Sequence, residues 1–254
     1  MRISLWRTSA LIGTAAATAL ALAVPATAIE PGAGAAYGAD AHVSLLPHVL
    51  GPGGLTVATG ELAASNTSGP TTASTVDAKL QGLVSAKVIT SASKHSTEDG
   101  TVTATASLVK VALPVLAALA GQTPTASVIS SRCQATSTGI TGSSDLADLN
   151  LGKIGSISAA TPNLRIGIPG VLQIIANEQI HNADGSLTVN ALHIELLGPG
   201  LAAALGSGDI VLASSTCGAA TTVSTTAPTV PEVSVVPAGA PQTGDGSLAT
   251  VIVH

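Results

Sequence analysis

The sequence predicts an all-β protein: a single antiparallel β-sandwich-like domain with an internal pseudo-twofold repeat and one short helix in each repeat. Three observations favour this class. The chain has few charged residues and abundant Thr, Ser, Val and Gly, as many β-rich extracellular domains do. Segments that alternate apolar and polar residues are joined by Asp-Gly pairs, which are strong hairpin signals. Several landmarks also recur at a nearly constant spacing, and a β-solenoid is the alternative architecture.

The first 28 residues have the organisation of a secretory signal peptide. A short basic region precedes the apolar segment TSALIGTAAATALALAV, and an A-x-A cleavage site ends at Ala28. We therefore expect cleavage between Ala28 and Ile29, with an uncleaved membrane anchor as the alternative. Beyond this segment no apolar run approaches the roughly 20 residues that a membrane-spanning helix requires, so we expect no transmembrane span in the mature chain.

After a short lead at 29–36, the β-rich domain is expected at 37–218, with repeats at about 82–133 and 168–217. Four landmarks recur in the same order, 84 or 85 residues apart: Asp99-Gly100 and Asp184-Gly185, the segments LPVLAALAG and GPGLAAALG, Leu108 and Leu192, and the sequences SSRC and SSTC. Each repeat predicts a strand, an Asp-Gly turn, a return strand, a helix of two turns that starts at Pro and ends at Gly, and a last strand that ends at Cys.

The apolar residues change face within each return strand. In the second return strand they follow one alternation through Leu187, Val189 and Ala191, and the opposite alternation begins at Leu192. The first return strand changes in the same way after Leu108. Because one extra residue reverses the alternation of a strand, we expect a β-bulge in each.

Cys133 and Cys217 are the only cysteines, and they end the two predicted last strands. In an exported chain, two thiols at equivalent ends of a repeat predict one disulfide, with free thiols or metal binding as the alternatives. A structural metal site would need more ligands at close spacing. The disulfide predicts that both strands end at the same rim, with Cα atoms within about 7 Å of each other.

The segment NEQIHNADGSLTVNALHIELL, residues 177–197, holds residue types from which acid–base and metal sites are built. Glu178 and His181 lie on the incoming strand of the second hairpin, Asp184 lies in its turn, and His193 lies on the outgoing strand. Their spacing matches no established motif, so we interpret them as structural and predict no catalytic, metal or cofactor site. The alternative is a secreted hydrolase that uses Glu178, His181 or His193.

The C-terminal region is of low complexity. Residues 219–239 are rich in Thr, Val and Pro and predict an extended linker. The tail at 240–254 begins with APQTG, in which Pro241, Thr243 and Gly244 match the LPxTG type of sorting motif, but no apolar span and basic tail follow. We interpret it as a degenerate or truncated sorting signal, with covalent wall attachment, non-covalent association and release as the alternatives.

Composition also excludes classes of partner. The formal net charge is −5 and the basic residues form no cluster, which argues against nucleic acid and anionic membrane surfaces. Phe is absent, and Tyr37 is the only aromatic residue after the signal segment. Modules that bind sugars or single strands stack their ligands on aromatic faces, so we do not expect binding of that kind.

The segments LQGLVSAKVITSAS, IPGVLQIIANEQ, NADGSLTVNALHIELLG and GDIVLASSTCG, in this order, resemble the choice-of-anchor P family of actinobacterial secreted and surface proteins. The resemblance covers roughly 37–218, and Asn177-Glu178-Gln179 and Asn190-Ala191-Leu192-His193 are its most specific pieces. It implies a surface domain carried by differing C-terminal anchors, with no enzymatic activity. We therefore expect an exported structural or adhesive protein of the cell envelope, whose envelope or surface partner is unknown.

Overall fold

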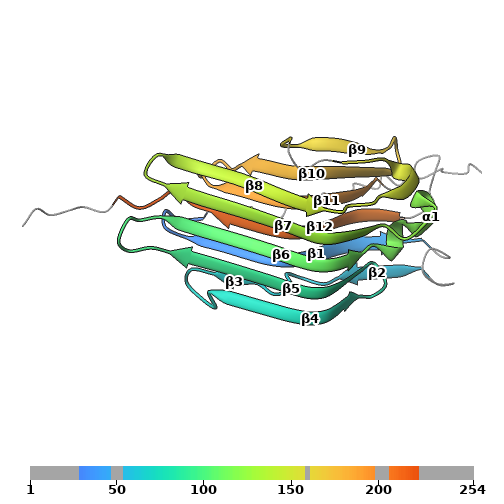
Figure 1. Ribbon diagram of the computed structural model, residues 1–254, viewed down its shortest axis with the longest axis horizontal. Coiled ribbons are helices and arrows are strands. Elements are labelled where there is room, and N and C mark those ends of the chain that lie inside the picture. The colour runs from blue at the N-terminus through green and yellow to red at the C-terminus, as the bar shows by residue number, and fades with distance from the viewer. Residues whose placement is uncertain (1–28, 47–53, 158–160, 198–205, 223–254) are drawn as a thin grey trace, which may run out of the picture.

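A computed structural model describes residues 29–46, 54–157, 161–197 and 206–222, which form two stacked antiparallel β-sheets (Figure 1). In this part of the chain the seven-stranded sheet has the order β2-β1-β12-β11-β10-β9, with β3 paired to β1, and the five-stranded sheet has the order β4-β5-β6-β7-β8. The predicted all-β sandwich is confirmed, and the solenoid alternative is wrong. The expected signal peptide up to Ala28 and the sorting-like residues Pro241, Thr243 and Gly244 lie outside the described residues.

The strands of the seven-stranded sheet are β1 (Gly34–Leu45), β2 (Leu55–Ala58), β3 (Ser65–Asn66), β9 (Leu164–Ile168), β10 (Leu172–His181), β11 (Leu187–Leu197) and β12 (Gly206–Cys217). The strands of the five-stranded sheet are β4 (Thr72–Leu80), β5 (Val84–His95), β6 (Val102–Ala112), β7 (Thr125–Thr136) and β8 (Gly139–Ala147). The short helices are η1 (Pro114–Leu116), α1 (Ala117–Ala120) and η2 (Gly152–Ile154).

The segments predicted as repeats occupy matching places in the two sheets. The first supplies β5, β6 and β7, and the second supplies β10, β11 and β12, each as three consecutive antiparallel strands. The Asp-Gly turns join the first two strands of each, and Gly100 and Gly185 have the expected positive φ, 68° and 81°. The helix predicted in the first repeat is present as η1 and α1, followed by Gly121 with φ 76°. The second predicted helix lies outside the described residues.

A row of residues with left-handed backbone conformation crosses each sheet, and we call this row the crease. Non-glycine residues rarely have positive φ, because Cβ then crowds a carbonyl oxygen. In the five-stranded sheet and its margin, the crease contains Asp77 (φ 50°), Lys110 (φ 52°) and Asp148 (φ 52°). In the seven-stranded sheet and its margins, it contains Ala63 (φ 51°), Ala213 (φ 53°), Asn177 (φ 49°) and Asn163 (φ 56°).

The crease reverses the alternation of side chains without changing the pairing of the strands. On β6, Leu108 before the crease and Val111 after it are both buried, although they are three positions apart and strict alternation would place them on opposite faces. The pairing of β6 with β7 continues in register from Val109↔Val128 to Val111↔Ala126. The predicted change of face is therefore confirmed, but the predicted β-bulge is wrong, because no extra residue is inserted at this pair.

One disulfide, between Cys133 on β7 and Cys217 on β12, joins the two sheets. Both cysteines are fully buried, and their Cα atoms are 5.9 Å apart, within the expected limit. Small residues let the sheets come this close, since a Cβ atom on Gly38 of β1 would collide with Ile89 of β5. In the chain-entropy model, a link across 84 residues stabilises the fold by roughly 4–5 kcal/mol.

Replacing Lys110 by glycine tests whether the crease carries backbone strain. Glycine adopts positive φ without the Cβ penalty, so Lys110→Gly should leave the free energy of unfolding unchanged or raise it by about 1 kcal/mol. Thr105→Gly, on the same strand outside the crease, is the control and should lower it by about 1 kcal/mol. Denaturant unfolding followed by circular dichroism measures both. Equal destabilisation by the two substitutions would contradict a strained crease.

Candidate functional site

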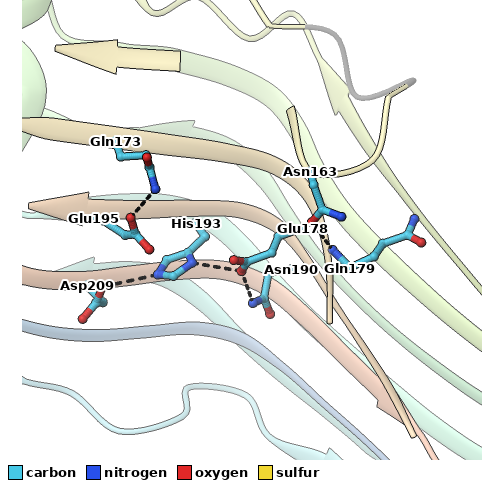
Figure 2. A network of polar contacts seen from close by, with 8 residues as sticks. All are labelled: Asn163, Gln173, Glu178, Gln179, Asn190, His193, Glu195 and Asp209. Carbon is cyan, nitrogen blue, oxygen red and sulfur yellow. Dashed lines mark hydrogen bonds and ion pairs between the residues drawn. The ribbon is translucent and has the colours of Figure 1, made fainter. Parts of the chain in front are cut away.

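A polar network lies on the outer face of the seven-stranded sheet, across β10, β11 and β12 (Figure 2). Strict alternation would place Asn190 and His193, three residues apart on β11, on opposite faces. The crease prevents this, because β11 turns Val189 into the core before it and Leu192 into the core after it. Asn190 and His193 therefore both face outward, and strand pairing sets Glu178 of β10 beside Asn190.

Glu178 is the centre of the network. Its Oε2 accepts a hydrogen bond from Nδ2 of Asn190 at 2.8 Å and lies 2.9 Å from Nδ1 of His193. Glu178 and Asn190 are only 8% and 6% exposed, and the side chain of His193 is 16% exposed. A carboxylate withdrawn from water in this way is stable only when partners replace its hydration, and these two residues supply them.

The pKa values of the pair follow from the same contacts. Burial raises the pKa of Glu178, but the hydrogen bonds from His193 and Asn190 outweigh it and hold the pKa below its ordinary value. Burial lowers the pKa of His193, but the bond to Glu178 and the surrounding carboxylates outweigh it and raise the pKa above its ordinary value. The two shifts favour the charged form of both residues, which is an ion pair.

The opposite side of His193 faces two further carboxylates. Its Nε2 lies 3.4 Å from Oδ1 of Asp209 on β12, and Glu195 lies beyond it on β11 (Figure 2). Nε2 of Gln173 donates to Oε2 of Glu195 at 2.5 Å. One ligand atom from each of His193, Glu195 and Asp209 lies within 4.8 Å of the others. These three are therefore the described residues that could hold a metal ion, and imidazole with carboxylates suits a divalent transition metal.

His181, the third residue of the hydrolase alternative, does not join this network. It lies at the exposed end of β10, paired with Leu187 next to the hairpin turn. Asp184 lies in that turn, where its Oδ1 accepts hydrogen bonds from N and Oγ of Ser186 at 2.9 and 2.6 Å. The structure thus brings Glu178 and His193 together and leaves His181 and Asp184 at the turn.

Sequence reasoning assigned no role to Asn190, Gln173 or Asp209. Asp209 contacts a histidine 16 residues earlier in the chain, and this proximity arises only because β12 pairs with β11. If the register of β11 against β12 were known, it would place Asp209 beside this site, since Glu195 and Asp209 are directly opposite each other. Gln173 lies opposite Glu195 on the other side, so one row of three strands supplies this half of the network.

The geometry suits a structural ion pair better than a hydrolytic site. A hydrolytic histidine directs one ring nitrogen at a nucleophile and the other at an orienting group. In His193 both ring nitrogens face carboxylates, Nδ1 that of Glu178 and Nε2 that of Asp209. The network is anchored on three paired strands, which hold it in one arrangement.

Comparisons of the chain with family models, with curated proteins and with solved structures find no match. The resemblance to the choice-of-anchor P family therefore stays a prediction. Among the described residues, none of the helices is both long and apolar enough to cross a membrane. The intramolecular disulfide is of the kind that forms in oxidising compartments, such as the extracellular space.

The ion pair predicts how stability depends on pH. The contribution of Glu178 is fully present above its unfolded pKa of 4.5 and is lost as pH falls through its lower folded pKa. The contribution of His193 is fully present below its unfolded pKa of 6.5 and is lost as pH rises through its higher folded pKa. Both are therefore complete between pH 4.5 and 6.5. Glu178→Gln removes both contributions, so its melting temperature should lie furthest below that of the parent between pH 4.5 and 6.5, and the difference should shrink at lower and at higher pH. A difference that does not change with pH would refute the pair.

A matched pair of histidine substitutions separates the network from the turn. His193→Gln leaves Glu178 buried without its ionic partner and should lower the free energy of unfolding by about 1–3 kcal/mol. His181→Gln changes an exposed residue of the same hairpin and should stay within about 0.5 kcal/mol of the parent. Urea unfolding measures both. Equal effects would mean that His193 has no special part in the fold.

Proposed function

We propose that this protein is an exported domain of the cell envelope, carried by its C-terminal region and acting as a structural or adhesive element rather than as a catalyst. The placement of the chain ends carries the proposal. β1 begins where β12 ends, with Gly34 paired to Cys217. Next to this pair, N of Gly32 donates to O of Ala219 at 2.8 Å. The described chain therefore enters and leaves the domain at one rim.

The first residues of the predicted linker are held against this rim. N of Thr221 donates to O of Gly100 at 3.1 Å, and its Oγ1 lies 3.0 Å from Nε2 of His95. Figure 1 shows the end of β12 leaving the sheets at this side, while η1 and α1 lie at the opposite rim. A tether that starts here would hold the opposite rim and the outer faces of both sheets away from the cell.

The other support comes from the sequence. The signal-like segment ending at Ala28, the low-complexity region at 219–239 and the sorting-like tail at 240–254 are the parts that an exported and tethered domain requires. The resemblance to the choice-of-anchor P family implies the same role. The disulfide across the two sheets suits a domain that must stay folded outside the cell.

Cell fractionation of the host tests the proposal. The full chain should be found with the envelope and be digested when intact cells are treated with proteinase K. A variant that ends at Thr222 keeps the described domain and should move to the medium, because its tether is missing. The purified full chain and the truncated variant should have the same melting temperature, which controls for misfolding. Recovery of the full chain in the cytosol, or envelope retention of the truncated variant, would contradict the proposal.

A further inference from the structure

Ile29 is bound to the turn of the second hairpin. Its backbone N lies 2.6 Å from Oδ2 of Asp184. The other carboxylate oxygen, Oδ1, accepts hydrogen bonds from N and Oγ of Ser186 at 2.9 and 2.6 Å, so Asp184 is oriented independently of Ile29. A donor this close to a carboxylate has the short length typical of charge-assisted hydrogen bonds.

The turn at 29–33 is seated on the end of β12 by contacts of its own. N of Ala33 donates to O of Glu30 at 2.9 Å, and N of Gly32 donates to O of Ala219 at 2.8 Å. A Cβ atom on Gly218 would collide with O of Glu30 and would touch the Ile29 side chain. Ile29 is therefore held at the hairpin by the residues that follow it.

Ile29 and Asp184 also line a cavity of about 230 Å³ that reaches Tyr37 and Glu61. Burial raises the pKa of Tyr37 to about 12 and raises that of Glu61 above its ordinary value. Hydrogen bonds from Ser186, and then the contact with Ile29, lower the pKa of Asp184. Of the titratable groups that line the cavity, Asp184 is therefore the one most firmly held as an anion.

The expected cleavage site ends at Ala28, which makes Ile29 the first residue of the mature chain. Hydrolysis of this peptide bond consumes one water and leaves a carboxylate on Ala28 and an ammonium group on Ile29. In the uncut chain the same nitrogen is a neutral amide with one hydrogen, whereas the ammonium has three hydrogens and a positive charge. Asp184 attracts the ammonium more strongly than the amide.

We propose that cleavage between Ala28 and Ile29 creates an ammonium group that binds Asp184 and fastens the mature N-terminus across the β10–β11 hairpin. The inference rests on the proposed export, because the cleavage belongs to it. Besides Asp184, the titratable groups that the described part of the chain places around this turn are Glu30 within it, His95, whose ring lies against Gly32, and Glu61 and Tyr37 around the cavity.

The test compares two N-termini of the chain that runs to His254. One form begins at Ile29, and the other carries Gly-Ser before Ile29, which moves the ammonium away from Asp184. At pH 6.5, Asp184→Asn should lower the melting temperature of the first form by about 1–4 °C, and that of the extended form by less than half as much. The difference should vanish as pH rises well above the α-amino range of about 7.7–8.0, where the ammonium loses its proton.

Asp99→Asn is the matched control. Asp99 occupies the equivalent turn of the first hairpin, where its Oδ1 accepts a hydrogen bond from N of Thr101 at 3.0 Å. This substitution should have the same effect on both forms. Equal effects of Asp184→Asn on the two forms would overturn the ion pair.

Intact mass of the secreted protein tests the cleavage itself. A mature chain that begins at Ile29 is expected, and one that begins elsewhere would overturn the proposal. Because both test forms can be prepared in vitro, the ion pair is measured without envelope fractionation. Failure of the envelope experiment and failure of this inference are therefore distinguishable.

Discussion

Left-handed backbone costs of order 1 kcal/mol or more at each non-glycine residue, and this protein places such residues in a row across each of its sheets. Asp77, Asp148, Asn163 and Asn177 belong to the residue types that tolerate positive φ best, but Lys110 and Ala213 do not. All of these residues keep positive φ because the strands are paired in register on both sides of the crease, and a change of φ would break that pairing. The hydrogen-bonded ladders of the sheets thus hold the strain in place.

The crease decides which side chains reach the core and which reach solvent. A strand that crosses it presents two successive positions to the same face, outward on β6 and inward on β11, so residues an odd number of positions apart can share a face. On β11 this places Asn190 and His193 together on the outer surface, and pairing with β10 adds Glu178. The polar network therefore depends on the crease. Its ion pair is largely withdrawn from water, because the side chains on neighbouring strands of the sheet surround it.

The disulfide links the inner faces of the two sheets. Cys133 and Cys217 close the last strands of the two repeat segments, and each strand lies in a different sheet. Their bond requires the sheets to approach closely, which small residues such as Gly38 permit. The rim held by this bond is also where the chain enters and leaves, so the ends of the domain are fixed at its most firmly linked part.

Much of the fold was predictable because hairpin chemistry and alternation are local. The Asp-Gly turns, the strands flanking them, the Pro-started helix and the change of face in β6 and β11 all follow from neighbouring residues. The crease was predictable only in part. The sequence shows that the alternation reverses, but an inserted residue and a left-handed residue leave the same pattern, and only the pairing distinguishes them.

The candidate site was also predictable only in part. Glu178 and His193 stood out because carboxylate and imidazole groups lie close together in the chain, and the hairpin brings such residues together by local pairing. Asp209 could not be assigned, because its contact with His193 depends on the register in which β12 pairs with β11, and no hairpin turn motif fixes that register. His181 was an equal candidate on sequence alone, and the register of the hairpin left it exposed at the turn. The sequence by itself thus determined the strands of the two repeats, their Asp-Gly turns and the cysteine pair, because these depend on neighbours and on the equivalence of the repeats. Only the tertiary structure decided which polar residues meet, because that depends on strand register and on the crease, which reverses faces across the whole sheet at once.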